Sequence, residues 1–256
     1  MQIKTLIKTI ASFFLAYIVA LCLAYALELL GWWGALYVYS RVLGVDIDTS
    51  DVLITQWLSH YQVFNILFVV IWPIVTYWLM KKFRCPVWER KASPSGFTRR
   101  YVFTGIAYGT GYGLCFLIIL FFLILFFQQI LGMSSQQILG TSLLSDINIF
   151  SKGRYTFPVL FLMYVLWPIS QGFLFWKLFY PSIRFSLNPI TCIILTGFLS
   201  AIFTTNPVAC VFMIIGGVIT SYLFERSQNM ATVFSFVLSM NLFPALLQIY
   251  FFLALA

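Results

Sequence analysis

One apolar run of the chain reads Trp167-Pro168-Ile169-Ser170-Gln171-Gly172-Phe173-Leu174-Phe175-Trp176-Lys177-Leu178-Phe179-Tyr180. Near its middle it carries two adjacent uncharged polar side chains, Ser170 and Gln171. A hydroxyl or an amide in hydrocarbon costs free energy unless it has a hydrogen-bond partner. We therefore expect Ser170 and Gln171 to face the interior of a helix bundle, where other helices supply polar partners.

The composition indicates a membrane protein. Hydrophobic residues make up 62% of the 256 residues and charged residues only 9%, whereas soluble domains carry about 25% charged residues. Aromatic residues reach 20%, which is typical of lipid-facing surfaces and interfacial belts. The first apolar run continues to about Gly31 without a small-residue cleavage site, which favours an uncleaved span. The fold class that follows is an all-α, polytopic membrane helix bundle.

Long apolar segments recur along the whole chain. A helix needs about 20 apolar residues to cross a bilayer, and about seven segments qualify: 6–30, 55–80, 101–131, 157–180, 188–205, 207–225 and 230–254. We divide the chain into an N-terminal three-span region, 1–131, which includes a basic cytoplasmic loop, 81–100; an external loop, 132–156; and a four-helix core, 157–256. Within the second segment, Pro73 predicts a kink.

The basic residues divide unequally between the two sides of the membrane. Of the 15 lysines and arginines, Arg41, Lys152 and Arg154 fall on one side in this topology, and the other twelve on the opposite side. By the positive-inside rule, the N-terminus is cytoplasmic and the C-terminus lies outside. The net charge of +8 therefore indicates contact with membrane lipids rather than with nucleic acid.

Glycines at helical spacing predict close contacts between helices. Gly105, Gly109 and Gly113 follow each other at four-residue intervals and so stack on one helix face. Gly216 and Gly217 form a second small-residue site in a later span. We expect these glycines to serve helix packing, mainly within one chain, with contact between two copies as the alternative.

Four segments within residues 157–250 follow a recognisable order. Ser170 to Phe175 lie where a Glu-Glu-x-x-x-Arg motif would lie, and Phe203-Thr204-Thr205-Asn206-Pro207 where Phe-x-x-x-His would lie. Gly216 to Arg226 look like a glycine-rich span ending in Tyr-Leu-x-Glu-Arg, and Val237 to Asn241 lie where His-x-x-x-Asn would lie. In this order and spacing the chain resembles the CPBP family, the CAAX-processing and bacteriocin-processing glutamic intramembrane proteases, which are also described as abortive-infection proteins.

The resemblance implies a glutamate that activates water, an arginine and a second glutamate that fix the state of the first, and histidine and asparagine groups that stabilise an oxyanion. Here the glutamate, arginine and histidine positions all carry other residues, and only the asparagine is retained. An amide cannot take a proton from water near neutral pH. We therefore expect no catalytic residue but a degenerate pocket, formed by Ser170, Gln171, Phe175, Thr204, Asn206, Pro207, Val237 and Asn241.

The function that this pattern predicts is binding. We expect a pseudoprotease of the bacterial inner membrane that acts as a scaffold or binding subunit for a membrane-protein partner. Its polar groups, Gln171, Thr204, Asn206 and Ser239 or Asn241, should hydrogen-bond to one another. An intramembrane endopeptidase with displaced groups is the alternative, with Glu28 or Glu225 as the nearby carboxylates; a transporter or channel component is a second. The single histidine, His60, and dispersed carboxylates predict no metal or other cofactor.

Overall fold

The structure is a computed structural model that describes residues 2–38, 41, 60–85, 99–132, 165–202 and 207–255. These residues are helical and form no strand, which confirms the all-α prediction for this part of the chain. The helices are α1 (Gln2–Tyr37), α3 (His60–Lys82), α4 (Arg99–Leu131), η2 (Gly172–Phe179), α7 (Tyr180–Arg184), α8 (Pro189–Ala201), α9 (Pro207–Ser227) and α10 (Met230–Leu255). The predicted loop 132–156 lies outside the described residues, apart from Gly132.

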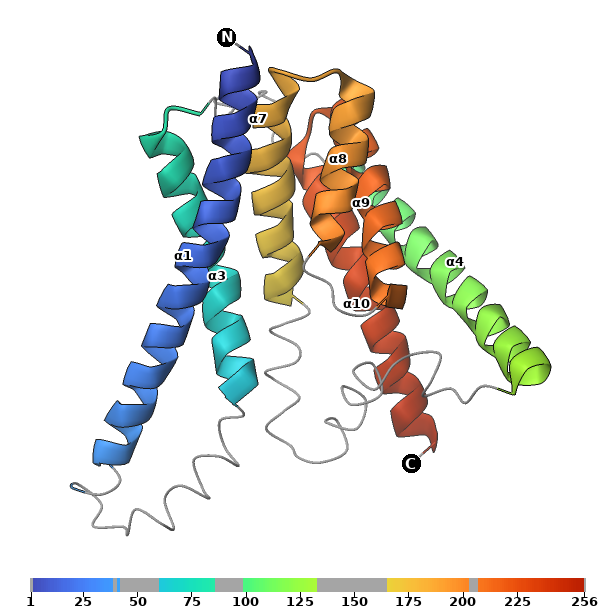
Figure 1. Cartoon of the computed structure of the whole chain (residues 1–256). Coiled ribbons are helices and arrows are strands. Elements are labelled where there is room, and N and C mark those ends of the chain that lie inside the picture. The colour runs from blue at the N-terminus through green and yellow to red at the C-terminus, as the bar shows by residue number, and fades with distance from the viewer. Residues whose placement is uncertain are drawn as a thin grey trace.

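Residues 165–184, called here the central helix, form one continuous rod in the middle of the bundle (Figure 1). α1 and α3 pack against each other on one side of this rod, and α8, α9 and α10 lie on its other side. α4 packs along α10 at the outer edge. The helices of the N-terminal region are therefore divided between two sides of the bundle, because α4 joins the C-terminal helices.

Three of the described helices are long and apolar enough to cross a membrane: Ile3–Gly31, Arg99–Ile130 and Ala209–Ser227. Two shorter apolar helices, Pro189–Ala201 and Met230–Leu242, accompany them. Large apolar side chains cover much of the outer surface of the bundle, including Phe103, Phe122 and Ile130 of α4. This composition fits a protein that lies in a membrane, and the number of spans remains a prediction.

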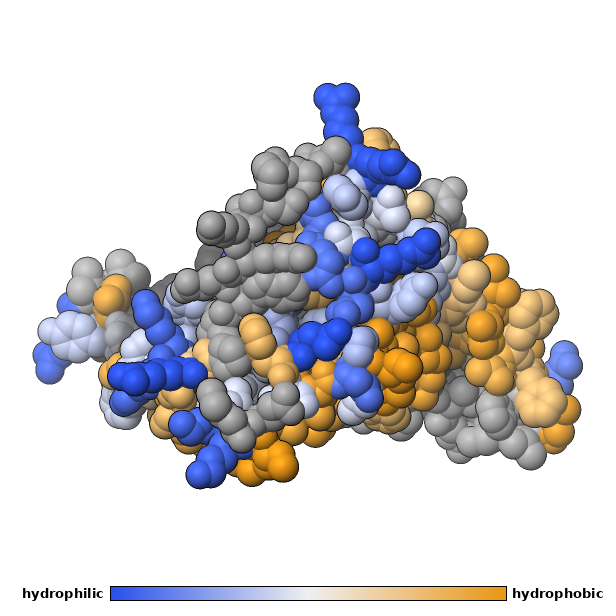
Figure 2. All heavy atoms as spheres, turned by 90° about the horizontal axis from the view of Figure 1, so that it is seen from above, coloured by the Kyte–Doolittle hydropathy of each residue, from blue (hydrophilic) through white to orange (hydrophobic). Residues whose placement is uncertain are grey.

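The helix ends that carry basic residues gather at one end of the bundle, called here the basic end. The beginnings of α1 and α4 and the ends of α3, α7 and α9 all lie there (Figure 1). Seen from this end, hydrophilic side chains lie over the apolar body of the molecule (Figure 2). The described basic residues at these helix ends are Lys4, Lys8, Lys81, Lys82, Arg84, Arg99, Arg100, Arg184 and Arg226.

Two glycines allow α4 to approach α10 closely. A Cβ atom at Gly105 would lie 2.5 Å from the carbonyl oxygen of Thr232, and one at Gly109 would lie 2.5 Å from that of Phe236. Gly113, one turn further along α4, is also buried. Because a Cβ atom at either position would overlap a backbone carbonyl as well as a serine hydroxyl of α10, any side chain there would force the two helices apart. The glycine face of α4 thus packs within the chain.

The second glycine pair, Gly216 and Gly217 of α9, lies against two different helices. A Cβ atom at Gly216 would lie 3.0 Å from the sulfur of Met240 in α10, whereas one at Gly217 would lie 3.0 Å from the Cα atom of Gly197 in α8. Next to Gly217, the hydroxyl of Ser200 donates to the carbonyl oxygen of Met213, at 3.1 Å. α9 is therefore held closely on two sides by glycine contacts and by a hydrogen bond from α8.

Candidate functional site

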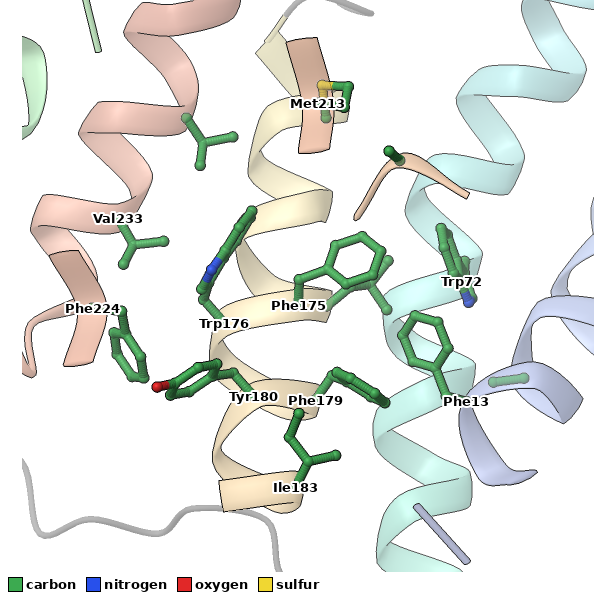
Figure 3. Close-up of a cluster of buried hydrophobic side chains, with 14 of the residues drawn as sticks. Phe13, Trp72, Phe175, Trp176, Phe179, Tyr180, Ile183, Met213, Phe224 and Val233 are labelled. Atoms are coloured by element: carbon green, nitrogen blue, oxygen red, sulfur yellow. The ribbon is translucent and has the colours of Figure 1, made fainter. Parts of the chain in front are cut away.

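The central helix presents two aromatic faces to opposite halves of the bundle. In its π-helical part the backbone N–H of Tyr180 donates to the carbonyl of Phe175, five residues earlier, so the turns are wider than in an α-helix. Residues four apart then share a face. Phe175 and Phe179 point toward α1 and α3, while Trp176 and Tyr180 point toward the side of α9 and α10 (Figure 3).

The face toward α1 and α3 is a dry aromatic cluster. The ring centroid of Phe13 lies 5.5 Å from that of Phe175 and 5.0 Å from that of Phe179, and Trp72 meets Phe175 edge-on at 6.2 Å (Figure 3). Phe175 is 1% exposed. Tilted and edge-to-face pairs at these distances stabilise a core beyond their burial. The position where the CPBP pattern has arginine is therefore occupied by a packing residue.

The opposite face carries two polar contacts one turn apart. The indole Nε1–H of Trp176 donates to Ser221 Oγ at 2.9 Å, and the hydroxyl of Tyr180 donates to Glu225 Oε2 at 2.8 Å. The guanidinium of Arg184 donates to the other carboxylate oxygen of Glu225 at 3.2 Å. These bonds tie the central helix to α9 and engage the Glu225 carboxylate on both oxygens.

Sequence reasoning did not identify this pairing of the central helix with α9. The signal was available, because Trp176 and Tyr180 are spaced four apart in one segment and Ser221 and Glu225 four apart in the other. When donors on one helix and acceptors on another have the same four-residue spacing, two hydrogen bonds can form one turn apart between the helices. Nothing in a single sequence, however, selects these two segments as partners from all the others.

Ser170 is buried and hydrogen-bonds to a backbone carbonyl of α3. A proline in α3 leaves that carbonyl without its usual donor. Its hydroxyl donates to the carbonyl oxygen of Val69 in α3, at 2.8 Å. In an α-helix this carbonyl would accept the N–H of residue 73, but Pro73 has none. α3 runs through Pro73 without interruption, and Ser170 supplies the donor that the proline lacks. Ser170 thus has a structural partner on α3.

This arrangement predicts a coupling between Ser170 and Pro73. We expect Ser170→Ala to lower the free energy of unfolding by about 1–2 kcal/mol, because the Val69 carbonyl loses its donor in an apolar interior. In a Pro73→Ala background the new N–H satisfies that carbonyl, so the same substitution should cost about 0.5 kcal/mol or less. Thermal unfolding of the four proteins in one detergent measures the coupling; equal losses in both backgrounds would contradict it.

Gln171 differs from Ser170 in having a buried polar atom without a partner. The side chain is 2% exposed, and its amide oxygen makes no hydrogen bond among the described residues. The next residue must be small, because a Cβ atom at Gly172 would lie 2.6 Å from the ring of Phe234. A desolvated acceptor of this kind costs about 1–3 kcal/mol, so its presence at a buried position calls for an explanation.

Ser239 and Asn241, the two described polar residues that were expected to meet Gln171, do not hydrogen-bond to its amide oxygen. Asn241 donates its amide to Val237 of its own helix at 2.7 Å, and Ser239 donates to Ser235 at 2.7 Å on a face that borders α4. The predicted hydrogen bond of Gln171 with Ser239 or Asn241 is therefore wrong: in α10 each group satisfies itself on its own backbone. Outside the described residues lie Thr204, Asn206 and the side chain of Pro207; Val237 is fully buried.

The described carboxylates lie away from Gln171. A general base has to lie beside the reacting water, so the positions of the described carboxylates bear on the question of hydrolysis. Tyr180 and Arg184 hold Glu225 about two turns from Gln171. Glu28 lies 15 residues beyond Phe13 on α1, or about 22 Å along the helix axis. Among the described residues, no three His, Cys, Asp or Glu side chains form a metal-binding group.

Comparison with known proteins assigns neither a family nor a function to this chain. No protein-family model matches the chain, and no curated protein or solved structure matches it. The class that the described residues themselves define is an all-helical bundle with membrane-length apolar helices and an aromatic interior.

Proposed function

We propose that this chain is a catalytically inactive, CPBP-like integral membrane protein that binds a membrane-protein partner and acts as a scaffold or subunit. The observation that carries the proposal is the hydrogen bonding of Ser170 and Gln171, the two residues at the positions where the CPBP pattern has glutamates. Ser170 is used to cap the Val69 carbonyl, while Gln171 keeps a buried amide oxygen without a described partner. A group of this kind suits recognition by hydrogen bonding rather than proton transfer.

Two features support binding over catalysis. First, the arginine position holds Phe175 in a close-packed aromatic cluster, which leaves no charge to orient a carboxylate. Second, the amide of Gln171 can both donate and accept a hydrogen bond. A partner helix with an exposed serine, threonine or amide side chain, or with an unsatisfied backbone group, has the chemistry to pair with it in an apolar environment. Because Gln171 is 2% exposed, the side chains that cover it would have to move aside to admit that group.

We also propose a seven-span topology in the bacterial inner membrane, with the N-terminus in the cytoplasm and the C-terminus outside. The gathering of basic helix ends at one end of the bundle supports this orientation, since that end would face the cytoplasm. The choice of membrane comes from the CPBP resemblance. Fluorescent-protein fusions test the orientation: a fusion to the C-terminus should stay dark outside the cytoplasm, and bright fluorescence would reverse the topology.

The binding proposal is tested by affinity purification in mild detergent with Gln171→Met. Methionine has similar length but no hydrogen-bonding amide, so the fold should be as stable as wild type or more stable. We expect wild type to retain a stoichiometric membrane protein and the variant to lose it by about tenfold or more, as the loss of a buried hydrogen bond implies.

A matched control is available on another helix. Thr196 of α8 is also fully buried, and its hydroxyl oxygen also has no described partner. Thr196→Val removes that hydroxyl with little change in shape, and it should leave the partner in place. A partner that Gln171→Met retains in full, or that both variants lose equally, would contradict the proposed role of Gln171.

A further inference from the structure

The end of α3 is folded back onto the bundle by a cap of unusual composition. The N–H of Cys85 donates to the carbonyl of Met80 at 2.9 Å and that of Arg84 to Lys81 at 3.1 Å, the paired bonds of a Schellman cap. In this motif the residue with positive φ is usually glycine, because a side chain is strained there. Here it is Arg84, with φ of 53°. The position therefore carries a positive charge, although a non-glycine residue is strained in this backbone conformation.

The cap brings cations from three helices around one small apolar cluster. Met80, Cys85 and Leu178 are buried together, with Phe173 packed against them. The ammonium of Lys177 lies 4.7 Å from the ring centroid of Phe173. From α1, Ser12 contacts the Cys85 sulfur at 3.7 Å and donates to the carbonyl of Lys8 at 2.6 Å, so Lys8 lies one turn above the same cluster. Besides Lys8 and Lys177, two further cations are chain neighbours of the cluster: Lys81 follows Met80, and Arg84 precedes Cys85.

These cations have no counter-ion among the residues that the structure describes. Within the described segments, the carboxylate at the basic end is that of Glu225, and Arg184 and Tyr180 already engage it. The side chains of Lys8, Lys81, Arg84 and Lys177 are all exposed. Unneutralised cations next to an apolar surface leave a strong positive potential at a boundary of low dielectric.

The neighbouring surface has the character of a membrane interface. Trp78 is 57% exposed on the last turns of α3, and the ammonium of Lys82 lies 4.8 Å from its ring centroid. Exposed tryptophans mark the headgroup level of a bilayer, and a lysine that packs its stem on one keeps its charge in the same layer. The end of α3 thus has the side chains that are typical of the headgroup level of a bilayer.

We propose that the cap of α3, together with Lys8 of α1 and Lys177 of the central helix, binds the headgroup of one anionic phospholipid. The phosphate carries the opposite sign of charge to the four cations, and the acyl chains fit the exposed apolar sides of α1 and α3. This inference rests on the proposed placement of the chain in a membrane, but it is independent of the role proposed for Gln171.

The experiment is native mass spectrometry of the full chain in detergent, titrated with phosphatidylglycerol and separately with phosphatidylcholine. We expect wild type to retain one phosphatidylglycerol more tightly than phosphatidylcholine and to release it as salt is raised. Soluble glycerol phosphate at millimolar concentration should not displace the lipid, which separates a lipid site from a phosphate site. Failure of the chain to enter detergent micelles would overturn the membrane placement itself.

The variants separate binding from folding. Lys177→Gln should weaken phosphatidylglycerol binding about fivefold. Arg84→Gly should do the same while leaving the melting temperature unchanged or higher, because glycine relieves the strained backbone. Arg41→Gln is the control: Arg41 is an exposed cation beyond the other end of α1, and its loss should change nothing. Equal affinity for the two lipids, an unchanged affinity in both site variants, or an equal loss in Arg41→Gln would overturn the proposal.

Discussion

Replacing Phe175 with arginine is expected to lower the free energy of unfolding by at least about 4 kcal/mol, although arginine is the residue that the CPBP pattern has at this position. Phe175 is 1% exposed, and the rings of Phe13 and Trp72 lie against it. A guanidinium there would lose its hydration, and no described carboxylate lies in the cluster to receive it. The melting temperature in detergent should fall by about 10 °C or more.

Phe175→Leu is the matched control for this prediction. It keeps an apolar side chain and removes volume, so it should cost about 1–3 kcal/mol through lost packing alone. The difference between the two variants isolates the cost of the charge. Similar melting temperatures for Phe175→Arg and wild type would show that a water-filled or acidic pocket lies at this position, and the CPBP-like catalytic interpretation would then have to be reopened.

The sequence was informative about class and burial because both depend on local composition. Charged residues at 9% indicated a membrane protein, with which the membrane-length apolar helices are consistent, and the apolar runs located the described helices. The adjacent polar pair within an apolar run predicted an inward position, and Ser170 and Gln171 are 6% and 2% exposed. These inferences depend only on the free-energy cost of placing a polar or charged side chain in hydrocarbon, which does not depend on the contacts with other helices.

The partners of the polar groups could not be predicted from the sequence. Ser170 binds a carbonyl that is free only because Pro73, far away in the chain, lacks an N–H. Asn241 was expected to turn toward Gln171, yet a carbonyl one turn back on its own helix was available at no cost in chain entropy. Spacing along one segment shows which residues share a face, but it does not show which face of another helix they meet.

Replacing Gly109 with alanine is expected to lower the free energy of unfolding by about 2–3 kcal/mol. The added Cβ would lie 2.5 Å from the carbonyl oxygen of Phe236 and 3.1 Å from its Cα atom. Neither backbone atom can move without separating α4 from α10. In the absence of a hydrophobic force between helices in lipid, close backbone contact holds such a pair together. The folded fraction after heating, read by size-exclusion chromatography, measures the loss.

Gly111 on the same helix gives this prediction its control, because a Cβ atom there would meet nothing within 4 Å. Gly111→Ala adds the same methyl group and the same gain in helix propensity, up to about 1 kcal/mol, so it should leave stability unchanged or raise it. The two substitutions are therefore expected to differ in sign. If both are neutral, α4 does not depend on its glycine face. If Gly111→Ala alone destabilises the protein, α4 packs through its opposite face against a second copy of the chain.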